Sequence, residues 1–281
     1  MIEIVLGFLI ATIVGMTGMG GGSFTTPALI LLIGLPTGQS VGTAMVFAAI
    51  LRMLAAPFYV VKRNVSLRLL GLLLLGATPG LLLGTWLLHY FFVESWKASA
   101  IVVVGILLTF SAAATFVPKF RNQKLAKQKP RWLAFLSFPI GVEMGFSSAG
   151  AGALGTLLML NFTEMSVPAI VGTDLLFGIG LSLVGGTFHF LWGAVNSLSL
   201  THLLMGGVPG VLFGCMLANR VPAKRLRTAI AVIAIVLGLQ LVWSGGQLMM
   251  REHALRQTEA NAKLKDKDVT SVKPASIATQ R

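Results

Sequence analysis

A few ionisable side chains interrupt otherwise apolar stretches of this sequence, and they are the first candidates for chemistry. Arg52 lies near the middle of the apolar run 41–61, and Asp174 and Glu143 lie in apolar runs of the second half. A charged group inside a membrane is costly, so such residues often mark substrate or proton pathways. The planar guanidinium of Arg52 could bind an oxyanion through several parallel donors. A structural pairing with an acid or a helix C-terminus is the alternative.

The two carboxyl groups suit proton transfer because apolar surroundings favour their neutral form. Asp174 and Glu143 could then carry protons near neutral pH, or they could pair structurally with Arg52. His189 and His202 lie in or near the membrane zone, where a histidine either relays protons or packs. We predict that Glu143, Asp174 and His189 couple proton movement to function.

The glycine-rich stretch 15–27 is a candidate anion site. Each glycine costs a helix roughly 1 kcal/mol relative to alanine, and five lie within eight positions: Gly15, Gly18, Gly20, Gly21 and Gly22. The apolar flanks 2–14 and 28–35 are each shorter than the roughly 20 residues that cross a bilayer. We predict a broken or re-entrant helix, with Pro27 in the first turn of its second part. Its bare backbone N–H groups could bind an anion, whereas close helix packing is the alternative.

The same pattern recurs 130 positions later, which indicates an internal duplication. The matches are Val41-Gly42-Thr43 with Val171-Gly172-Thr173, Pro79-Gly80 with Pro209-Gly210, and Gly15, Gly20 and Gly22 with Gly145, Gly150 and Gly152. In secondary transporters, paired interrupted segments are the best sequence pointer to the substrate site. Hydroxyl groups near the breaks add possible donors. The predicted substrate-binding residues are Gly20, Gly21, Gly22, Ser23, Thr25, Arg52, Ser147, Ser148, Gly150 and Gly152.

The composition predicts an all-α polytopic membrane protein. Of its 281 residues, 55% are hydrophobic and 11% are charged, and the apolar runs are continuous rather than alternating. We predict two homologous four-span repeats (offset 130), each starting with a Gly-broken or re-entrant helix. The net charge of +13 falls in loops and the tail, which favours contact with anionic lipid over nucleic acid.

The predicted parts of the chain are a first transmembrane repeat at 1–117, a basic linker loop at 118–131, a second transmembrane repeat at 132–247 and a polar tail at 248–281. We expect the tail to be solvated and disordered. If the repeats are inverted, all three basic loops lie inside and the tail lies outside. If the repeats are parallel, one basic loop lies outside, against the positive-inside rule. The sequence leaves both arrangements open, although the loops favour inversion.

Several motifs together resemble the sulfite exporter TauE/SafE family of membrane permeases. They are the ending Gly-Gly-Gly-Ser-Phe-Thr-Thr-Pro27, the repeated Val-Gly-Thr, and Pro-Gly followed by glycine four residues later. The resemblance covers residues 1–247 and implies transport of sulfite, sulfoacetate or related sulfonates by a multi-pass protein of the cell (inner) membrane. The second glycine-rich stretch departs from the pattern, with Ser and Ala at some glycine positions and no proline at Leu157.

The combined expectation is a proton-coupled secondary transporter for a small sulfur-containing anion, working by alternating access. Its partners are the anionic substrate, the proton and the lipid bilayer, without cofactor, metal or nucleic acid. We expect no enzyme, because the sequence holds no HExxH motif, no serine-hydrolase elbow and a single cysteine, Cys215. The alternatives are a cation permease that uses Asp174, Glu143, His189 and His202, or a non-transport membrane scaffold. The substrate, the direction of transport and the oligomeric state stay open.

Overall fold

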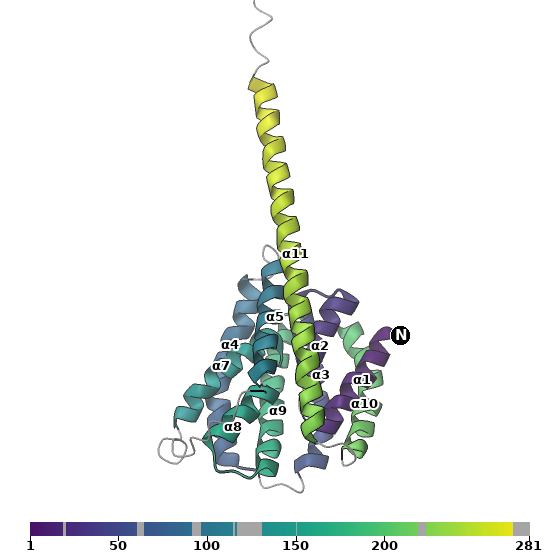
Figure 1. Cartoon of the computed structure of the whole chain (residues 1–281), viewed down its shortest axis with the longest axis vertical. Coiled ribbons are helices and arrows are strands. Elements are labelled where there is room, and N and C mark those ends of the chain that lie inside the picture. Colours follow the sequence, from purple (N-terminus) through teal and green to yellow (C-terminus); the bar gives the residue numbers. More distant parts are fainter. Residues whose placement is uncertain are drawn as a thin grey trace, which may run out of the picture.

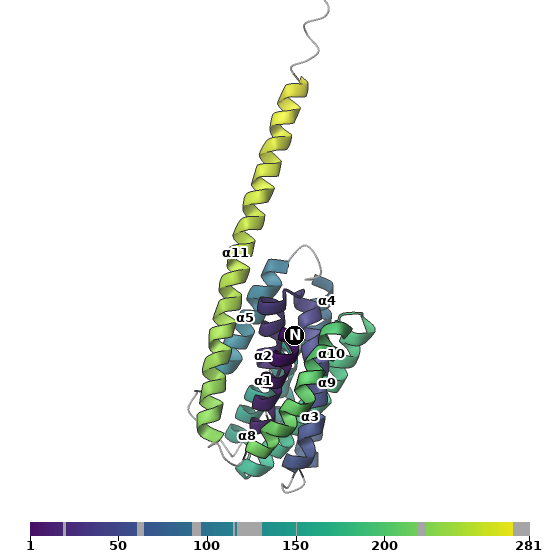
Figure 2. The same cartoon turned by 90° about the vertical axis from the view of Figure 1, so that its right-hand side faces the viewer.

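The computed structural model describes residues 1–18, 21–60, 65–91, 97–114, 116, 131–149, 151–218 and 223–271. Within these ranges every regular element is a helix, as Figure 1 and Figure 2 show. Among the described residues, five helices are long and apolar enough to cross a membrane: Thr37–Tyr59, Leu67–Tyr90, Ala169–Leu191, Ser197–Leu217 and Ala231–Arg251. The prediction of an all-α membrane protein is confirmed.

The first half of the chain begins with a helix in two parts. Its elements are α1 (Ile2–Thr17), α2 (Gly22–Ala28), the π-helix η1 (Leu29–Ile33), α3 (Thr37–Val60), α4 (Leu67–Phe91) and α5 (Lys97–Ala114). Both parts of the first element are too short to cross a bilayer alone.

The second half also begins with a helix in two parts. Its elements are α7 (Arg131–Ser147), the π-helix η2 (Ala151–Gly155), α8 (Thr156–Phe162), α9 (Val167–Leu191), α10 (Ser197–Leu217) and α11 (Ala223–Ser271).

The second part of the first element begins earlier than predicted. Pro27 was expected in its first turn, but α2 starts at Gly22 and holds Pro27 next to its last residue. A proline inside a helix removes one backbone hydrogen bond and crowds the preceding turn. The wider π-helical turn at Leu29–Ile33 follows directly and is a usual way to absorb such a local irregularity.

The tail is helical as far as Ser271, whereas a disordered tail was predicted. Residues 248–271 were expected to lack regular structure, but they continue α11, which extends well beyond the other helices in Figure 1. This segment is rich in Ala, Leu, Glu, Gln, Lys and Arg, the strongest helix formers. The preceding apolar part of α11 also supplies a helical nucleus, so the tail need only extend it.

Two pairs of helices run parallel and pack backbone to backbone. Gly206 and Gly214 of α10 face the carbonyl groups of Ile4 and Thr12 on α1, at distances that leave no room for a Cβ. The same contacts occur between α4 and α7, 130 positions away, at Gly76 with Ala134 and at Gly84 with Val142. Small residues allow this close approach of membrane helices.

Two other pairs run antiparallel. Along α3 and α9, Gly42 lies near His189 and Met45 lies near Gly185. Helices α5 and α11 pair in the same way, with Gly245 near Ala98 and Gly238 near Thr109. The helix ends that flank the three basic loops consequently lie together at the lower end of the bundle in Figure 1, whereas α11 extends from the upper end. This is the arrangement that inverted repeats would produce.

Candidate functional site

Both glycine-rich stretches interrupt their helices in the same way. α1 ends at Gly18, which adopts a left-handed conformation (φ 67°) and donates its N–H to the Val14 carbonyl oxygen at 2.8 Å. α7 ends at Ser148, which is also left-handed (φ 60°) and donates to the Met144 carbonyl oxygen at 2.8 Å. Gly18 and Ser148 are 130 positions apart, so the two breaks fall at corresponding residues. A left-handed serine is strained, whereas a left-handed glycine is not.

The two interrupted helices meet in the protein interior. The Thr26 hydroxyl on α2 donates to the Ser147 carbonyl oxygen at 3.1 Å and lies 2.8 Å from the Ser148 hydroxyl oxygen. Gly22 packs directly on the Ser148 backbone, where any Cβ would collide with the carbonyl group. Thr26, Ser147 and Ser148 are fully buried. The irregular backbone is therefore covered by protein, as a lipid environment requires.

The remaining predicted residues of the two breaks make no contact between them that the structure describes. Thr25 bonds within its own helix, since its hydroxyl donates to the Gly21 carbonyl oxygen at 2.9 Å. Ser23 is half-buried. Gly152 is buried in η2, and Gly20 and Gly150 lie outside the described residues. Thr26 rather than the predicted Thr25 thus makes the contact between the breaks.

Arg52 is 1% exposed and links α3 to α9. Its guanidinium donates to the Gly178 carbonyl oxygen at 2.8 Å and to the Ser182 hydroxyl, and Ser182 is the residue 130 positions after Arg52. A Cβ at Gly178 would lie 2.7 Å from the guanidinium carbon, so the glycine makes room for the arginine. Arg52 and Ser182, which are 130 positions apart, therefore touch in the protein interior where α3 and α9 pack together.

Asp174 connects α9 to the second interrupted helix. Its carboxylate accepts a hydrogen bond from the Thr156 hydroxyl at 2.7 Å and packs against Gly155, where η2 meets α8. It also attracts Arg52 electrostatically. Thr156 was not among the predicted site residues, although it lies 130 positions after Thr26 and the repeat could have identified it.

The other two predicted proton-coupling residues, Glu143 and His189, have neighbours different from those of Asp174, and so does His202. Glu143 is 4% exposed on α7 and lies beside Ser111 of α5, and neither of its carboxylate oxygens has a hydrogen-bond partner. His189 lies near His89 of α4 instead. His202 pairs with Glu3 at the start of α1. Within the described ranges no three His, Cys, Asp or Glu side chains gather as a metal site would require.

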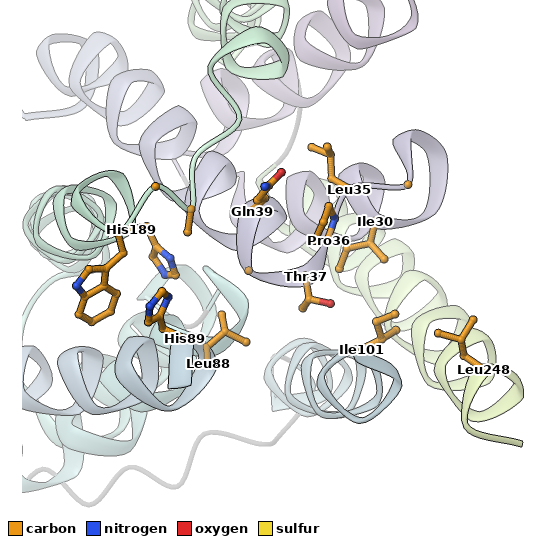
Figure 3. Close-up of a pocket in the computed structure, with 15 residues that line it drawn as sticks. Ile30, Leu35, Pro36, Thr37, Gln39, Leu88, His89, Ile101, His189 and Leu248 are labelled. Carbon is orange, nitrogen blue, oxygen red and sulfur yellow. The ribbon is translucent and has the colours of Figure 1, made fainter. Parts of the chain in front are cut away.

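A cavity of about 570 Å³ opens beside His189, near the ends of α4 and α9 and the start of α3. Figure 3 shows the imidazole rings of His89 and His189 close together on one side of it, with Gln39 and Thr37 on another. The lining residues are Ile30, Gly34, Leu35, Pro36, Thr37, Gly38, Gln39, Leu88, His89, Ile101, His189, Trp192, Gly193, Ala194 and Leu248. No local sequence pattern predicts this cavity, because its lining comes from five separate segments.

The residue that corresponds to His189 has a different environment. Tyr59, 130 positions earlier, lies at the opposite end of the bundle and donates its hydroxyl to the Gly15 carbonyl oxygen at 2.6 Å. Its ring also packs over Gly18 at the first break. His189 lies close to the corresponding Gly145 backbone, but neither ring nitrogen has a hydrogen-bond partner.

Comparison with known proteins gives one family and several relatives. A family model described as "Sulfite exporter TauE/SafE" matches residues 3–241. The chain is similar to the probable membrane transporter protein YjnA of Bacillus subtilis, with 30% identity over 250 residues that cover 85% of this chain and 98% of the relative. It is also similar to YdhB of the same organism, with 28% identity over 86% of this chain and the whole relative.

A more distant similarity extends to another bacterium. A probable membrane transporter protein of Haemophilus influenzae is 24% identical over 86% of this chain and 93% of the relative. No solved structure gives a significant match. The similarities cover the helical bundle almost completely.

Proposed function

The chain belongs to the sulfite exporter TauE/SafE family of membrane transporters, and on this premise we propose that it is a secondary transporter for small sulfur-containing anions such as sulfite or organosulfonates. The observation that carries the proposal is the buried contact of Thr26 with Ser147 and Ser148. Two interrupted helices that meet away from lipid are the usual setting of a transporter substrate site. The description of the family as sulfite exporters supports the choice of a sulfur oxyanion.

An inverted duplication supports transport by alternating access. Helices α3 and α9 begin 130 positions apart and run antiparallel. Each first element, α1 or α7, packs parallel to a helix of the other half. The Thr43 hydroxyl accepts from the Asn196 N–H at 3.0 Å, and the Thr173 hydroxyl accepts from the Ser66 N–H at 3.4 Å, again with both partners shifted by 130. Such halves can exchange conformations around a shared central site.

The substrate site in this proposal lies between the breaks. Backbone N–H groups at Gly21–Ser23, where α2 begins, and at Ala151 and Gly152, where η2 begins, supply donors, and hydroxyl groups add further hydrogen bonds. Arg52 provides a permanent positive charge nearby, which offsets the cost of bringing an anion into a membrane interior. Asp174 interacts electrostatically with Arg52, so protonation of its carboxyl group would change the potential at the site. That coupling is our reason to keep Asp174 as the proton carrier.

The test is uptake or efflux by the purified chain in liposomes. Sulfite, 2-hydroxyethanesulfonate and sulfate are offered separately, with and without an imposed pH gradient. Thr26→Val removes the hydroxyl that joins the breaks and leaves buried acceptors unpaired, at about 1–3 kcal/mol. We expect transport to fall at least 10-fold. Thr201→Val is the matched control, since that exposed hydroxyl bonds only to its own helix at Ser197.

Proton coupling has its own variant. Asp174→Asn keeps the shape of the side chain but cannot exchange a proton at physiological pH. We expect transport down the anion gradient to persist and its acceleration by the pH gradient to disappear. A full response to the pH gradient in the variant would remove Asp174 from the mechanism, and absence of transport for every sulfur anion would remove the proposed substrate class.

A further inference from the structure

The cavity beside His89 and His189 has the features of a binding site rather than of a packing defect. His189 is 1% exposed, lines the cavity and has no hydrogen-bond partner for either ring nitrogen. A buried polar side chain without a partner is costly, so such a group usually has a ligand or water to bind. A neutral imidazole can still donate one hydrogen bond.

A helix N-terminus faces the same cavity. α3 begins at Thr37, and Thr37, Gly38 and Gln39 all line the cavity. The Ser40 N–H already bonds to the Pro36 carbonyl oxygen at 2.9 Å, and the Ser40 hydroxyl donates to the Leu35 carbonyl oxygen at 3.3 Å. The N–H groups before Ser40 therefore have no acceptor within the helix, as in any first turn, and they carry partial positive charge.

The charges around the cavity favour an anion. The described lining residues include no carboxylate and no Lys or Arg, and their ionisable side chains are His89 and His189. His89 stacks on Trp192 with ring centres 4.8 Å apart, which fixes the orientation of its imidazole. Both histidines and the first turn of α3 are donors of hydrogen bonds, and no fixed negative charge opposes an anionic ligand.

The rest of the lining is apolar and large. Ile30, Leu88, Ile101, Trp192 and Leu248 contribute carbon surface. A volume of about 570 Å³ is far greater than a bare oxyanion needs, since one water occupies about 30 Å³ of liquid. It lies in the usual range for pockets that enclose organic ligands. The ligand should therefore have an apolar body as well as a charged head.

We infer that this cavity is a second, entrance-side binding site for an organic anion, whose charged head binds His89, His189 and the first turn of α3 while its apolar body lies against Leu88, Trp192 and Ile101. The ends of α4 and α9 and the start of α3, which line the cavity, lie at the end of the bundle opposite the starts of α4, α7 and α11 (Figure 1). His189 is also close to Gly145 in the last turn of α7, so the site adjoins the second break. The inference rests on the proposed function, because it supplies that central site with substrate.

The experiment measures binding to the full chain in lipid nanodiscs by Trp fluorescence. The probes are benzenesulfonate, benzoate, the neutral benzenesulfonamide, and sulfite. We expect the two organic anions to bind, with benzenesulfonamide and sulfite each at least 10-fold weaker. The affinities for benzenesulfonate and benzoate together show whether the site distinguishes a sulfonate from a carboxylate or binds either negative charge.

Two variants locate the site. His89→Phe keeps the stacking on Trp192 and His189→Phe keeps the ring volume, but each removes the imidazole N–H. Both should weaken benzenesulfonate binding at least 10-fold and leave benzenesulfonamide binding unchanged. His202→Phe is the matched control, since that histidine pairs with Glu3 and does not line the cavity. In liposomes, the KM for an organic sulfonate should rise in both variants with little change in kcat.

The outcomes separate this site from the proposed function. Unchanged benzenesulfonate binding in both variants, or equal binding of the neutral sulfonamide, would overturn the entrance site. Binding of neither organic anion to the unmodified chain would do the same. Binding that is lost in both variants, in a chain that transports no sulfur anion, would support the entrance site and refute the proposed function.

Discussion

Tyr59 and His189, which are 130 positions apart, lie at opposite ends of the helical bundle and have different surroundings. Near the end of α3, Tyr59 donates to the Gly15 carbonyl oxygen and its ring packs over Gly18 at the first break. At the other end, His189 of α9 lies close to the Gly145 backbone, has no hydrogen-bond partner for either ring nitrogen, and borders a cavity of about 570 Å³. A hydrogen bond joins α3 to α1 at the first end, whereas a cavity lies beside α9 at the other.

This difference indicates how alternating access would work in such a chain. If the halves are inverted copies, the reverse state arises when each adopts the conformation of the other. The Tyr59 contact would then open, and His189 would approach the Gly145 carbonyl. Tyrosine and histidine are both able to donate one hydrogen bond there, although a tyrosine reaches further. Removal of the hydrogen bond between Tyr59 and Gly15 should therefore shift the equilibrium between the two states.

Loss of Arg52 should have the largest effect on transport. Its guanidinium joins α3 to α9 through Gly178 and Ser182, at the point where corresponding residues of the two halves meet. Arg52→Ala removes the buried charge and leaves a cavity, so we expect transport of sulfite in liposomes to fall more than 100-fold. Arg52→Lys keeps the charge without the planar fork and should recover part of the activity.

Folding must be checked separately, because breaking a buried polar network can cost several kcal/mol. A monodisperse Arg52→Ala protein with a cooperative thermal transition and ordinary sulfite transport would exclude Arg52 from the mechanism. The same protein without transport would support it.

Gly22→Ala should come next, because it separates the two breaks. A Cβ at Gly22 would collide with the Ser148 carbonyl group, and overpacking of this kind costs about 1–3 kcal/mol. We expect a lower melting temperature and at least 10-fold slower transport. Gly71→Ala on α4 is the matched control, since nothing lies within 4 Å of its position, and alanine there should stabilise the helix by up to about 1 kcal/mol. Equal behaviour of the two variants would show that the breaks tolerate separation.

Tyr59→Phe should have a smaller effect, on the balance between states. It removes only the hydroxyl that bonds to the Gly15 carbonyl oxygen, and a net hydrogen bond is worth about 1 kcal/mol, or roughly a fivefold change in an equilibrium. The measurement is the rate at which a maleimide labels Gln39→Cys in the cavity, with Cys215 replaced by serine. The rate should fall by up to fivefold, because the state in which the cavity is accessible loses about 1 kcal/mol relative to the reverse state. An unchanged rate would mean that Tyr59 does not hold this state.

The interrupted helices could be predicted because composition alone disfavours continuous helix at both stretches. Their side-chain contacts could not be predicted, since successive helical residues differ in direction by about 100°. Pro27 suggested a late helix start, whereas the start at Gly22 turns Thr25 to its own backbone and Thr26 to the second break. The contact between the two breaks therefore depends on a helix boundary that the sequence pattern misplaced by a few residues.

The burial of Arg52 could also be predicted from the sequence, whereas its acceptors and the cavity could not. A buried arginine in an apolar run is conspicuous in a sequence, and its burial follows from the cost of exposing it to lipid. Its acceptors depend on the register of α3 against α9, which Gly178 permits by lacking a side chain. The cavity depends on residues from η1, α3, α4, α5, α9 and α11 and from the loops beside them. Each contributes only a few ordinary residues, so no local pattern identifies it.

Substitutions of Ser148 should have the smallest effect. Ser148 adopts the left-handed conformation at the second break, as Gly18 does at the first. Ser148→Gly relieves strain of about 1 kcal/mol but removes the hydroxyl that meets Thr26, so the net change in stability should be a few tenths of a kcal/mol. Ser148→Ala removes the same hydroxyl and keeps the strain, so it should be about 1 kcal/mol less stable than Ser148→Gly. Thermal unfolding of both variants in one detergent measures the difference. Equal melting temperatures would mean that the second break carries no backbone strain, and that the two breaks differ only in their side chains.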